Sequence, residues 1–420
     1  MKRKEELTGL TYLVKNNFWT KDLPTTASSN FLADFIVGEE ATVIKLLAKK
    51  KAILKGKTVL DEFACGGTGL LANSGPITNP YNSKHITGGS SSGSALAVAQ
   101  KLVSFALGSD TGGSARQPAA YCGIVGFKPS GGLISRSGLI PMASSLDTVG
   151  ILANSVSTGQ KVFSVIAQTD PGDLLTTASQ QLKVKPISFS SARKIAVLEE
   201  IEQYLSPEFV KLYQKVIVIL KQKKYQVETI KIPPKIRENL QLAYLIICSS
   251  ELVSHLNACQ GITCGPKIDQ VDRNMSHKID HQIQQNRTDY LGKSVRQRLL
   301  LGSYFLQNKN DCEQAYLFQQ KVEDWSHKVF RKYDFLLFPT SNSEAPKINQ
   351  STFFFTGSQT HWSDNLLLLA NFGGFPSLSL PIGLVNGLPV SININAAYKQ
   401  ENLLFQLAKL IEKEISFQMK

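Results

Sequence analysis

The chain has 420 residues, of which 42% are hydrophobic and 19% are charged. This balance supplies enough apolar surface for a large core, and it excludes both wholesale disorder and a fibrous repeat. Lysine and arginine total 46 against 33 acidic residues, which gives a formal net charge of +13. Such a charge suits an anionic partner such as RNA, and it equally suits a basic surface that has no such partner.

The sequence carries no apolar run long enough to span a membrane. The first residues, MKRKEE, are not followed by the apolar stretch and small-residue cleavage site of a signal peptide. Six cysteines are scattered along the chain, at positions 65, 122, 248, 259, 264 and 312. We therefore expect reduced thiols in a cytoplasmic protein that has no contact with a membrane.

The first 130 residues contain two glycine-rich turns between regular elements. Residues 40–51 place apolar side chains at helical spacing, and residues 52–58 follow as a short strand. Residues 88–94 form a Gly/Ser-rich turn that leads into a helix. Residues 103–110 predict a buried strand that ends in the second glycine-rich loop.

Strands and helices alternate through the rest of the chain. Ser206-Pro207 opens a helix over 206–223 that has one apolar stripe. Further strands are expected at 194–200, 225–232, 334–339, 377–382 and 389–395, and further helices near 239–258, 290–332 and 399–414. The polar residues 259–290 predict a loop or variable insert. This alternation predicts an α/β fold in which helices cover both faces of a sheet.

Three motif matches fail on inspection. Gly56-Lys57-Thr58 resembles the end of a phosphate-binding P-loop, but Lys51 occupies the position of the first glycine. His277 and His281 are four residues apart without the glutamate of a metalloprotease motif, so we expect no metal site. Residues 89–93 fit the G-x-S-x-G elbow of α/β-hydrolases, but no downstream histidine is an obvious member of a triad.

The two Gly/Ser-rich loops, 88–100 and 106–130, suggest a different serine chemistry. Consecutive glycines let backbone N–H groups converge on a small anion, as an oxyanion hole requires. A serine nucleophile also needs a base. In the absence of a suitable histidine, the remaining candidate is a lysine whose pKa is lowered toward neutrality by burial.

These loops resemble the amidase signature family. The similarity is carried by YLVKNNFW at 12–19, GGSSSGS at 88–94 and GSDTGGSARQPAAYCGIVGFKPS at 108–130. It implies a triad in which Ser114 is the nucleophile, Lys15 is the base, and Ser90 bridges them after a cis peptide bond. It also implies the amidase-signature α/β fold, a large mixed β-sheet covered on both faces by helices and built as one domain over residues 1–420.

The family mechanism implies a proton path through this triad. Neutral Lys15 would draw a proton through Ser90 from Ser114, whose oxygen attacks a carboxamide carbon. Ser90 would return the proton to the departing ammonia, and water would then release the acyl group. The oxyanion would be held by four backbone N–H groups, those of Thr111, Gly112, Gly113 and Ser114.

Within the family, GKTVLDEFACGG at 56–67 resembles the A subunits of tRNA-dependent amidotransferases. The implied activity is hydrolysis of glutamine to supply ammonia for converting Glu-tRNA(Gln), Asp-tRNA(Asn) or both. No cofactor is implied for this chain. The B subunit of the amidotransferase would use ATP and Mg²⁺ and contact the tRNA, and the C subunit would complete a heterotrimer.

The same resemblance implies a pocket for a zwitterion. Arg298 matches the arginine that grips the α-carboxylate of glutamine, Asp364 matches the aspartate near the α-ammonium group, and Tyr244 matches a pocket tyrosine. A fatty-amide or aryl-amide amidase would have no use for such a pair of charges.

Some features depart from the family pattern, and two alternatives stay open. Only 14 residues precede Lys15, which predicts a shortened N-terminus. Ser92, Ala115 and the segment ACGGTG at 64–69 replace usual residues, and the last is expected to alter the pocket lining. One alternative is a stand-alone amidase acting on another small carboxamide. The other is a non-catalytic scaffold or RNA-binding subunit, against which the intact triad argues.

Overall fold

The computed structural model describes residues 7–181, 193–257, 264–266, 276–350 and 365–415. Ten strands in these ranges form one sheet, in the order β2-β1-β3-β5-β4-β9-β10-β8-β6-β7. They are β1 (Thr11–Lys15), β2 (Ile53–Thr58), β3 (Phe105–Asp110), β4 (Val125–Lys128), β5 (Thr148–Ala153), β6 (Lys194–Leu198), β7 (Gln226–Ile230), β8 (Phe335–Pro339), β9 (Ser377–Val385) and β10 (Leu388–Ala396). The two ends of the sheet are parallel and its centre is antiparallel. The expected mixed sheet is confirmed.

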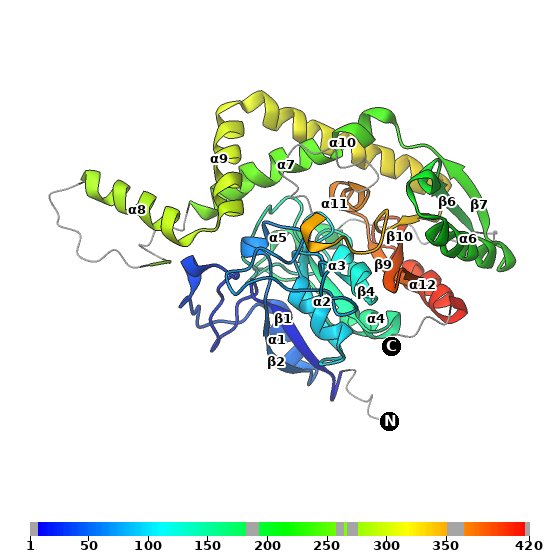
Figure 1. Ribbon diagram of the computed structural model, residues 1–420, viewed down its shortest axis with the longest axis horizontal. Helices are drawn as coiled ribbons and strands as arrows, with labels where there is room; N and C mark the ends of the chain where they lie inside the picture. The colour runs from blue at the N-terminus through cyan, green and yellow to red at the C-terminus, as the bar shows by residue number, and fades with distance from the viewer. Residues whose placement is uncertain (1–6, 182–192, 258–263, 267–275, 351–364, 416–420) are drawn as a thin grey trace.

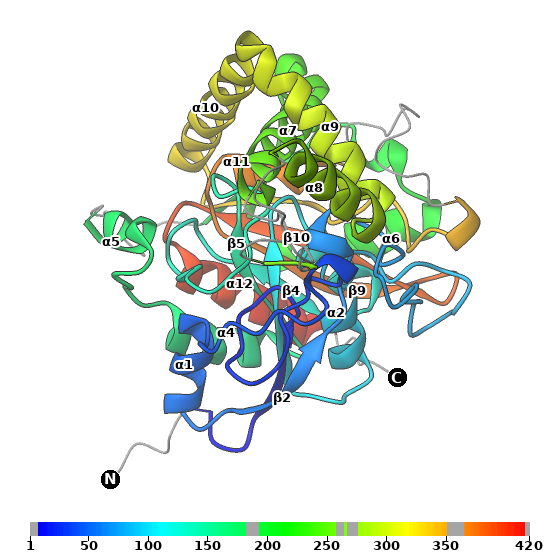
Figure 2. The ribbon, with the colours of Figure 1, turned by 90° about the vertical axis from the view of Figure 1, so that its left-hand side faces the viewer.

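Helices pack against both faces of this sheet (Figures 1 and 2). They are α1 (Thr42–Lys49), α2 (Ser92–Ala99), α3 (Arg116–Tyr121), α4 (Val156–Ile166), α5 (Leu174–Gln181), α6 (Pro207–Gln222), α7 (Pro234–Leu256), α8 (Ser276–Tyr290), α9 (Lys293–Gln307), α10 (Lys309–Lys332), α11 (Leu368–Phe372) and α12 (Glu401–Ile415). The α2 and α3 helices contact β3, β4 and β5, while α4, α6 and α12 contact one another or the strands from the opposite face. The central strands are therefore covered twice and lie in the core.

The alternation of side chains along β3 shows how both faces are buried. Phe105 and Leu107 join the larger hydrophobic cluster together with Ile151 of β5. Ala106 and Leu152 point the other way and join a second cluster, made mostly of small residues from α2 and α3. Because successive side chains of a strand point to opposite faces, both faces of β3 need apolar residues, and its sequence reads as a nearly continuous apolar run.

A helical layer formed by α7, α9 and α10 lies over one side of the sheet, and α8 projects from it (Figure 1). The stretch 290–332, expected to be helical, forms two helices, because the helical structure is interrupted at Asn308 between α9 and α10. The expectation of a loop throughout 259–290 is wrong for α8. This helix is so polar that it has no apolar stripe by which the sequence could have revealed it.

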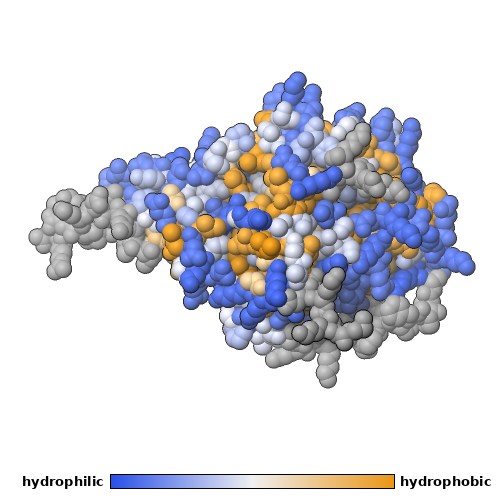
Figure 3. All heavy atoms as spheres, turned by 90° about the horizontal axis from the view of Figure 1, so that it is seen from below, coloured by the Kyte–Doolittle hydropathy of each residue, from blue (hydrophilic) through white to orange (hydrophobic). Residues whose placement is uncertain are grey.

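No helix in the described ranges is long and apolar enough to cross a membrane. Figure 3 shows hydrophobic residues gathered near the middle of one face, with hydrophilic residues around them. Five of the six cysteines fall in the described part of the chain, and all five are free thiols.

The contact between α7 and α9 leads to a prediction about stability. Gly302 of α9 lies so close to α7 that a Cβ there would overlap the Ser249 carbonyl group. Gly302→Ala should therefore lower the free energy of unfolding by about 1–3 kcal/mol, as overpacking does. Urea unfolding followed by circular dichroism measures the change.

The matched control is Gly159→Ala in α4, where the nearest atom to the new methyl group is the Ala153 Cβ at 3.9 Å. Here alanine fits and favours the helix, so stability should stay the same or rise by up to about 1 kcal/mol. Equal losses in the two variants would show that the close approach of α7 and α9 is not the cause.

Candidate active site

The sheet brings the first and second candidate segments to one edge. Lys15 is the last residue of β1, and β3, which pairs with β1 in parallel, ends at Asp110. Because parallel neighbours end at the same edge of a sheet, the Gly/Ser-rich loop after β3 emerges beside Lys15. The turn before α2 reaches the same place, since α2 packs on β1, β2 and β3.

Lys15 is fully buried and joined to two hydroxyl groups. Its Nζ donates hydrogen bonds to Ser90 Oγ at 2.7 Å and to Ser109 Oγ at 2.8 Å. Ser109 Oγ also accepts a hydrogen bond from Asn17 Nδ2 at 3.1 Å. Burial lowers the pKa of Lys15 from 10.5 to about 7, because an ammonium group loses its hydration there. The amine is therefore substantially neutral at physiological pH.

The turn that carries Ser90 has the backbone geometry that the family resemblance implies. The Gly89–Ser90 peptide bond is cis, and the Ser90 side chain is fully buried. The next N–H group, that of Ser91, donates to the Ser114 carbonyl oxygen at 3.1 Å. This bond ties the Ser90 turn to the Ser114 loop, so the structure places all three members of the expected triad in one region.

The Ser114 loop runs from Asp110 to the start of α3, and its N–H groups point in two directions. The Gly113 N–H donates to Asp110 Oδ1 at 2.8 Å, and the Ala115 N–H donates to Asp110 Oδ2 at 3.2 Å. The expectation that the Gly113 N–H helps to hold an oxyanion is therefore corrected, because the carboxylate engages it. The N–H groups of Thr111, Gly112 and Ser114 remain as the candidates for that role.

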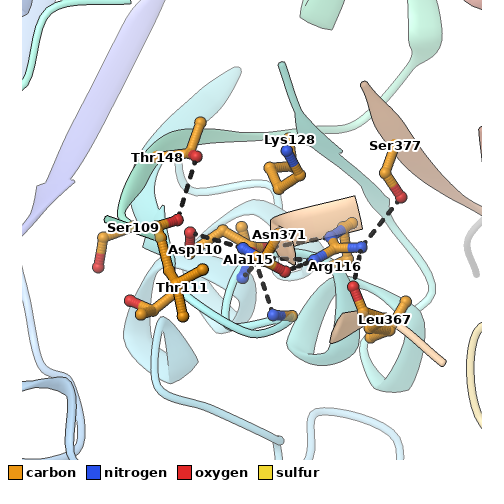
Figure 4. A network of polar contacts seen from close by, with 12 residues as sticks. Ser109, Asp110, Thr111, Ala115, Arg116, Lys128, Thr148, Leu367, Asn371 and Ser377 are labelled. Atoms are coloured by element: carbon orange, nitrogen blue, oxygen red, sulfur yellow. Dashed lines mark hydrogen bonds and ion pairs between the residues drawn. The ribbon is translucent and has the colours of Figure 1, made fainter. Parts of the chain in front are cut away.

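A buried ion pair holds this loop in place (Figure 4). Asp110 and Arg116 are both fully buried and form a two-pronged contact, at 2.9 Å between Nη2 and Oδ1 and 3.0 Å between Nε and Oδ2. Arg116 also donates to Ser377 Oγ at 3.0 Å and to Asn371 Oδ1 at 2.7 Å. The Arg116 guanidinium keeps the pKa of Asp110 well below its usual range, so this carboxylate stays charged.

Neither this ion pair nor the contact between Ser109 and Lys15 is predicted by the sequence motifs. A signal was present, since Asp110 and Arg116 are the only charged residues in the stretch GSDTGGSAR. A charge that the chain keeps inside a Gly/Ser-rich segment needs a partner when it is buried. What the local sequence does not reveal is that Asn371 and Ser377, more than 250 residues away, complete the arrangement.

One cavity receives most of the predicted site residues. Its lining includes Gly112, Gly113, Ser114, Tyr244 and Arg298. Tyr244 comes from α7 and Arg298 from α9, so the helical layer forms the wall opposite the serine loop.

Four further residues bear on the predicted lining of this cavity. Thr111 does not line the cavity, because its hydroxyl turns away to Asp147 Oδ1 at 2.5 Å. Asp364 lies outside the described residues. Gly66 and Gly67 of the unusual ACGGTG segment line the cavity, as expected.

This arrangement can perform serine chemistry with an amine base. Ser114 faces the cavity together with Gly112 and Gly113, and Ser90 is hydrogen-bonded to the buried Lys15. Arg298 is only 4% exposed and brings a positive charge into the same cavity, which favours a substrate with an anionic group. Within the described ranges, no group of three or more His, Cys, Asp and Glu side chains could hold a metal ion.

The sequence matches the family described as Amidase over residues 1–405. A relative from Mycoplasma genitalium, the A subunit of glutamyl-tRNA(Gln) amidotransferase, is 34% identical over 414 residues, which cover 97% of this chain and 86% of the relative. A relative of the same name from Methanospirillum hungatei is 35% identical over 410 residues, with coverages of 97% and 93%.

Solved structures agree with these relatives. The crystal structure of the A subunit of glutamyl-tRNA(Gln) amidotransferase from Thermotoga maritima has a TM-score of 0.78 and 30% identity, covering 97% of this chain and 83% of that chain. The native peptide amidase from Stenotrophomonas maltophilia has a TM-score of 0.79 and 26% identity, with coverages of 98% and 84%. The site geometry, the extent of the family match and these likenesses lead to one conclusion: the chain belongs to the amidase family.

Proposed function

We propose that this chain hydrolyses the side-chain carboxamide of glutamine and supplies the ammonia as the A subunit of a tRNA-dependent amidotransferase. The observation that carries the chemistry is the fully buried Lys15, hydrogen-bonded at 2.7 Å to Ser90 beside the loop of Ser114. The choice of glutamine is supported by Arg298 in the same cavity and by relatives of that name that are 34–35% identical over 97% of this chain.

The reaction begins with a proton transfer. The protonated amine of Lys15 donates to both Ser90 and Ser109. When Lys15 is neutral, its bond to Ser90 reverses, and Ser90 takes the proton of Ser114 as it passes its own to the amine. The Ser114 oxygen then forms a bond to the amide carbon. Negative charge develops on the carbonyl oxygen, and the N–H groups of Thr111, Gly112 and Ser114 are the donors available to hold it.

The second half returns the proton. The carbon–nitrogen bond breaks, and the proton held by Lys15 passes through Ser90 to the departing ammonia. Water attacks the acyl group on Ser114 and releases glutamate, with the same residues acting as the base. All of the steps use groups of this chain alone.

The pocket fits glutamine through its charges. Arg298 binds the α-carboxylate, Tyr244 forms the adjoining wall, and Asp364 receives the α-ammonium group. With the substrate held by its charged groups, the carboxamide is presented to Ser114, which lines the same cavity. Binding energy from the remote charges then orients the reacting group.

The remaining steps belong to the other subunits of the heterotrimer. The B subunit uses ATP and Mg²⁺ to activate the carboxylate of Glu-tRNA(Gln) or Asp-tRNA(Asn), and the C subunit holds the assembly together. This chain itself needs no cofactor, contacts tRNA only through its partner and works in the cytoplasm. Its net charge of +13 suits a position beside an anionic tRNA.

A stand-alone amidase is the second candidate, supported by the structural likeness to a peptide amidase at a TM-score of 0.79. Hydrolysis assays with glutamine, asparagine and apolar amides, in the presence and absence of partner subunits, separate the two. Rapid hydrolysis of apolar amides without turnover of glutamine would overturn the proposed function.

Ser114→Ala should abolish glutamine hydrolysis, with a loss of at least about 10⁴-fold, because no other group forms the acyl intermediate. Amidation of tRNA with ammonium as the nitrogen source should continue in the reconstituted complex, since only the source of ammonia is lost. The control is Ser92→Ala, another buried serine, which should keep glutaminase activity. Glutamine-dependent amidation by the Ser114→Ala complex would instead favour a scaffold role.

The pH dependence of kcat/KM for glutamine should reflect the protonation of the Lys15 amine. Protonated Lys15 cannot accept a proton, and burial lowers its pKa to about 7, so activity should fall about tenfold per pH unit below pH 7. Above that pH the rate should level off.

Lys57→Met is the matched control for this profile. Burial lowers the pKa of Lys57 to about 7 as well, but its Nζ donates to Thr20 and Thr25, away from the triad. The variant should keep the acid limb of the profile unchanged. If the fall in kcat/KM at acid pH disappeared in Lys57→Met, the profile would report Lys57, and the assignment of Lys15 as the base would be contradicted.

Arg298→Met should raise KM for glutamine by about 10²-fold or more, because the substrate carboxylate loses a buried charged partner. Hydrolysis of butyramide, which has no carboxylate, should change little. The comparison of the two substrates distinguishes lost recognition from a damaged fold, and equal losses on both would contradict the assigned role.

A further inference from the structure

Asp147 connects the Ser114 loop to a second turn. Its Oδ1 accepts the Thr111 hydroxyl at 2.5 Å, and its Oδ2 accepts the N–H groups of Met142 at 2.8 Å and Ala143 at 3.0 Å. The Asp147 side chain does not line the cavity that holds Ser114. It lies behind the loop, at the start of β5, and only 6% of the residue is exposed.

The loop is thus held by carboxylates from two sides. Asp110 engages the N–H groups of Gly113 and Ala115, while Asp147 engages the side chain of Thr111. Between them lies Gly112, whose N–H remains a candidate donor to the oxyanion. An oxyanion hole works only when its donors are fixed before charge develops, so what holds Thr111 also sets the direction of its neighbour.

The turn that carries Asp147 is itself anchored to the helical layer. Glu251 of α7 accepts the Ser145 N–H at 3.0 Å, the Ser145 hydroxyl at 2.5 Å and the Tyr316 hydroxyl of α10 at 2.9 Å. Asp147 therefore holds the loop against a fixed support rather than against a free turn.

We propose that Asp147 is a positioning residue for the hydrolysis: its carboxylate fixes Thr111 and so aligns the backbone N–H groups that hold the oxyanion. This inference rests on the proposed function. Both carboxylate oxygens are needed as acceptors, one for Thr111 and the other for two N–H groups. An asparagine in the same place has only one acceptor oxygen, which the two N–H groups need, so its NH2 group can only donate to the Thr111 hydroxyl and the charge-assisted bond from Thr111 is lost.

The test compares Thr111→Val, Asp147→Asn and the double variant in the full chain, assembled with its partner subunits. The expected result is a fall in kcat for glutamine of about 10²-fold in each single variant. KM should change by less than about threefold, as when an interaction made mainly in the transition state is lost. The kcat of the double variant should be no lower than that of the less active single variant, because both changes remove the contact between Thr111 and Asp147.

A transition-state analogue gives an independent readout. The aldehyde analogue of glutamine forms a tetrahedral adduct with Ser114, and its inhibition constant should rise in parallel with the fall in kcat. The binding of glutamate, which forms no adduct, should stay the same. If Asp147 had a merely structural role, the variants would contain less folded enzyme. The inhibition constant of the aldehyde and the binding constant of glutamate would then stay the same.

Two controls keep the outcome decisive. Thr111→Ser retains the hydroxyl and should retain most of kcat. The comparison of Thr111→Val with Thr111→Ser therefore tests the contact to Asp147 even if Asp147→Asn does not fold. Glu412→Gln removes another partly buried carboxylate, which accepts the Val156 N–H at 2.9 Å away from the site, and kcat should not change.

Folded Thr111→Val and Asp147→Asn enzymes with the parent kcat, or losses confined to KM, would overturn the role of Asp147. A parent enzyme that turned over another carboxamide but not glutamine would overturn the proposed substrate. In that case the same comparison, made with the accepted amide and its aldehyde, still decides the role of Asp147.

Discussion

Lysine acts as a base at neutral pH only when its pKa is lowered, and this fold lowers the pKa of Lys15 by keeping water away from the amine. Lys15 ends a strand that lies between β2 and β3, and its amine donates hydrogen bonds to the hydroxyl groups of Ser90 and Ser109. Asp61, Asp110 and Asp147 each raise its pKa from nearby, but less than burial lowers it. Each of these carboxylates accepts hydrogen bonds from other donors, so it stabilises the loops without pairing directly with the amine.

Around the Ser114 loop, too, the charged groups that hold the loop are separate from the small neutral groups that line the cavity. The Ser114 loop contributes Gly112, Gly113 and Ser114 to the cavity lining, and their small side chains let a substrate approach the backbone closely. The charges that hold them, above all the Asp110–Arg116 pair, lie behind the loop and away from solvent. Buried charges of this kind are costly unless they are fully hydrogen-bonded, and here the contacts to Asn371 and Ser377 meet that requirement. Precise placement of neutral groups therefore depends on charged ones.

The convergence of Lys15, Ser90 and Ser114 in one region could be predicted because they stand inside recognisable motifs, and several strands could be predicted from their apolar runs. Strands β1, β4 and β5 could not be predicted, because β1 has a run of only three apolar residues and glycine interrupts both β4 and β5. The α8 helix was missed because its apolar residues are too few for a clear stripe, with only Ile279 and Ile283 one turn apart in a polar sequence. The roles of Ser109 and Asp147 depend on contacts between residues 36 to 94 positions apart, which no local pattern contains.

The order of these residues along the chain has a consequence for biosynthesis. The base is synthesised 75 residues before Ser90 and 94 residues before Ser109, and Asn371 and Ser377 follow more than 250 residues after Arg116. An amine on a growing polypeptide is hydrated and protonated, so it is no base at neutral pH. Lys15 therefore leaves the ribosome as an ordinary protonated amine, and its pKa falls only when the later residues fold around it and bury it.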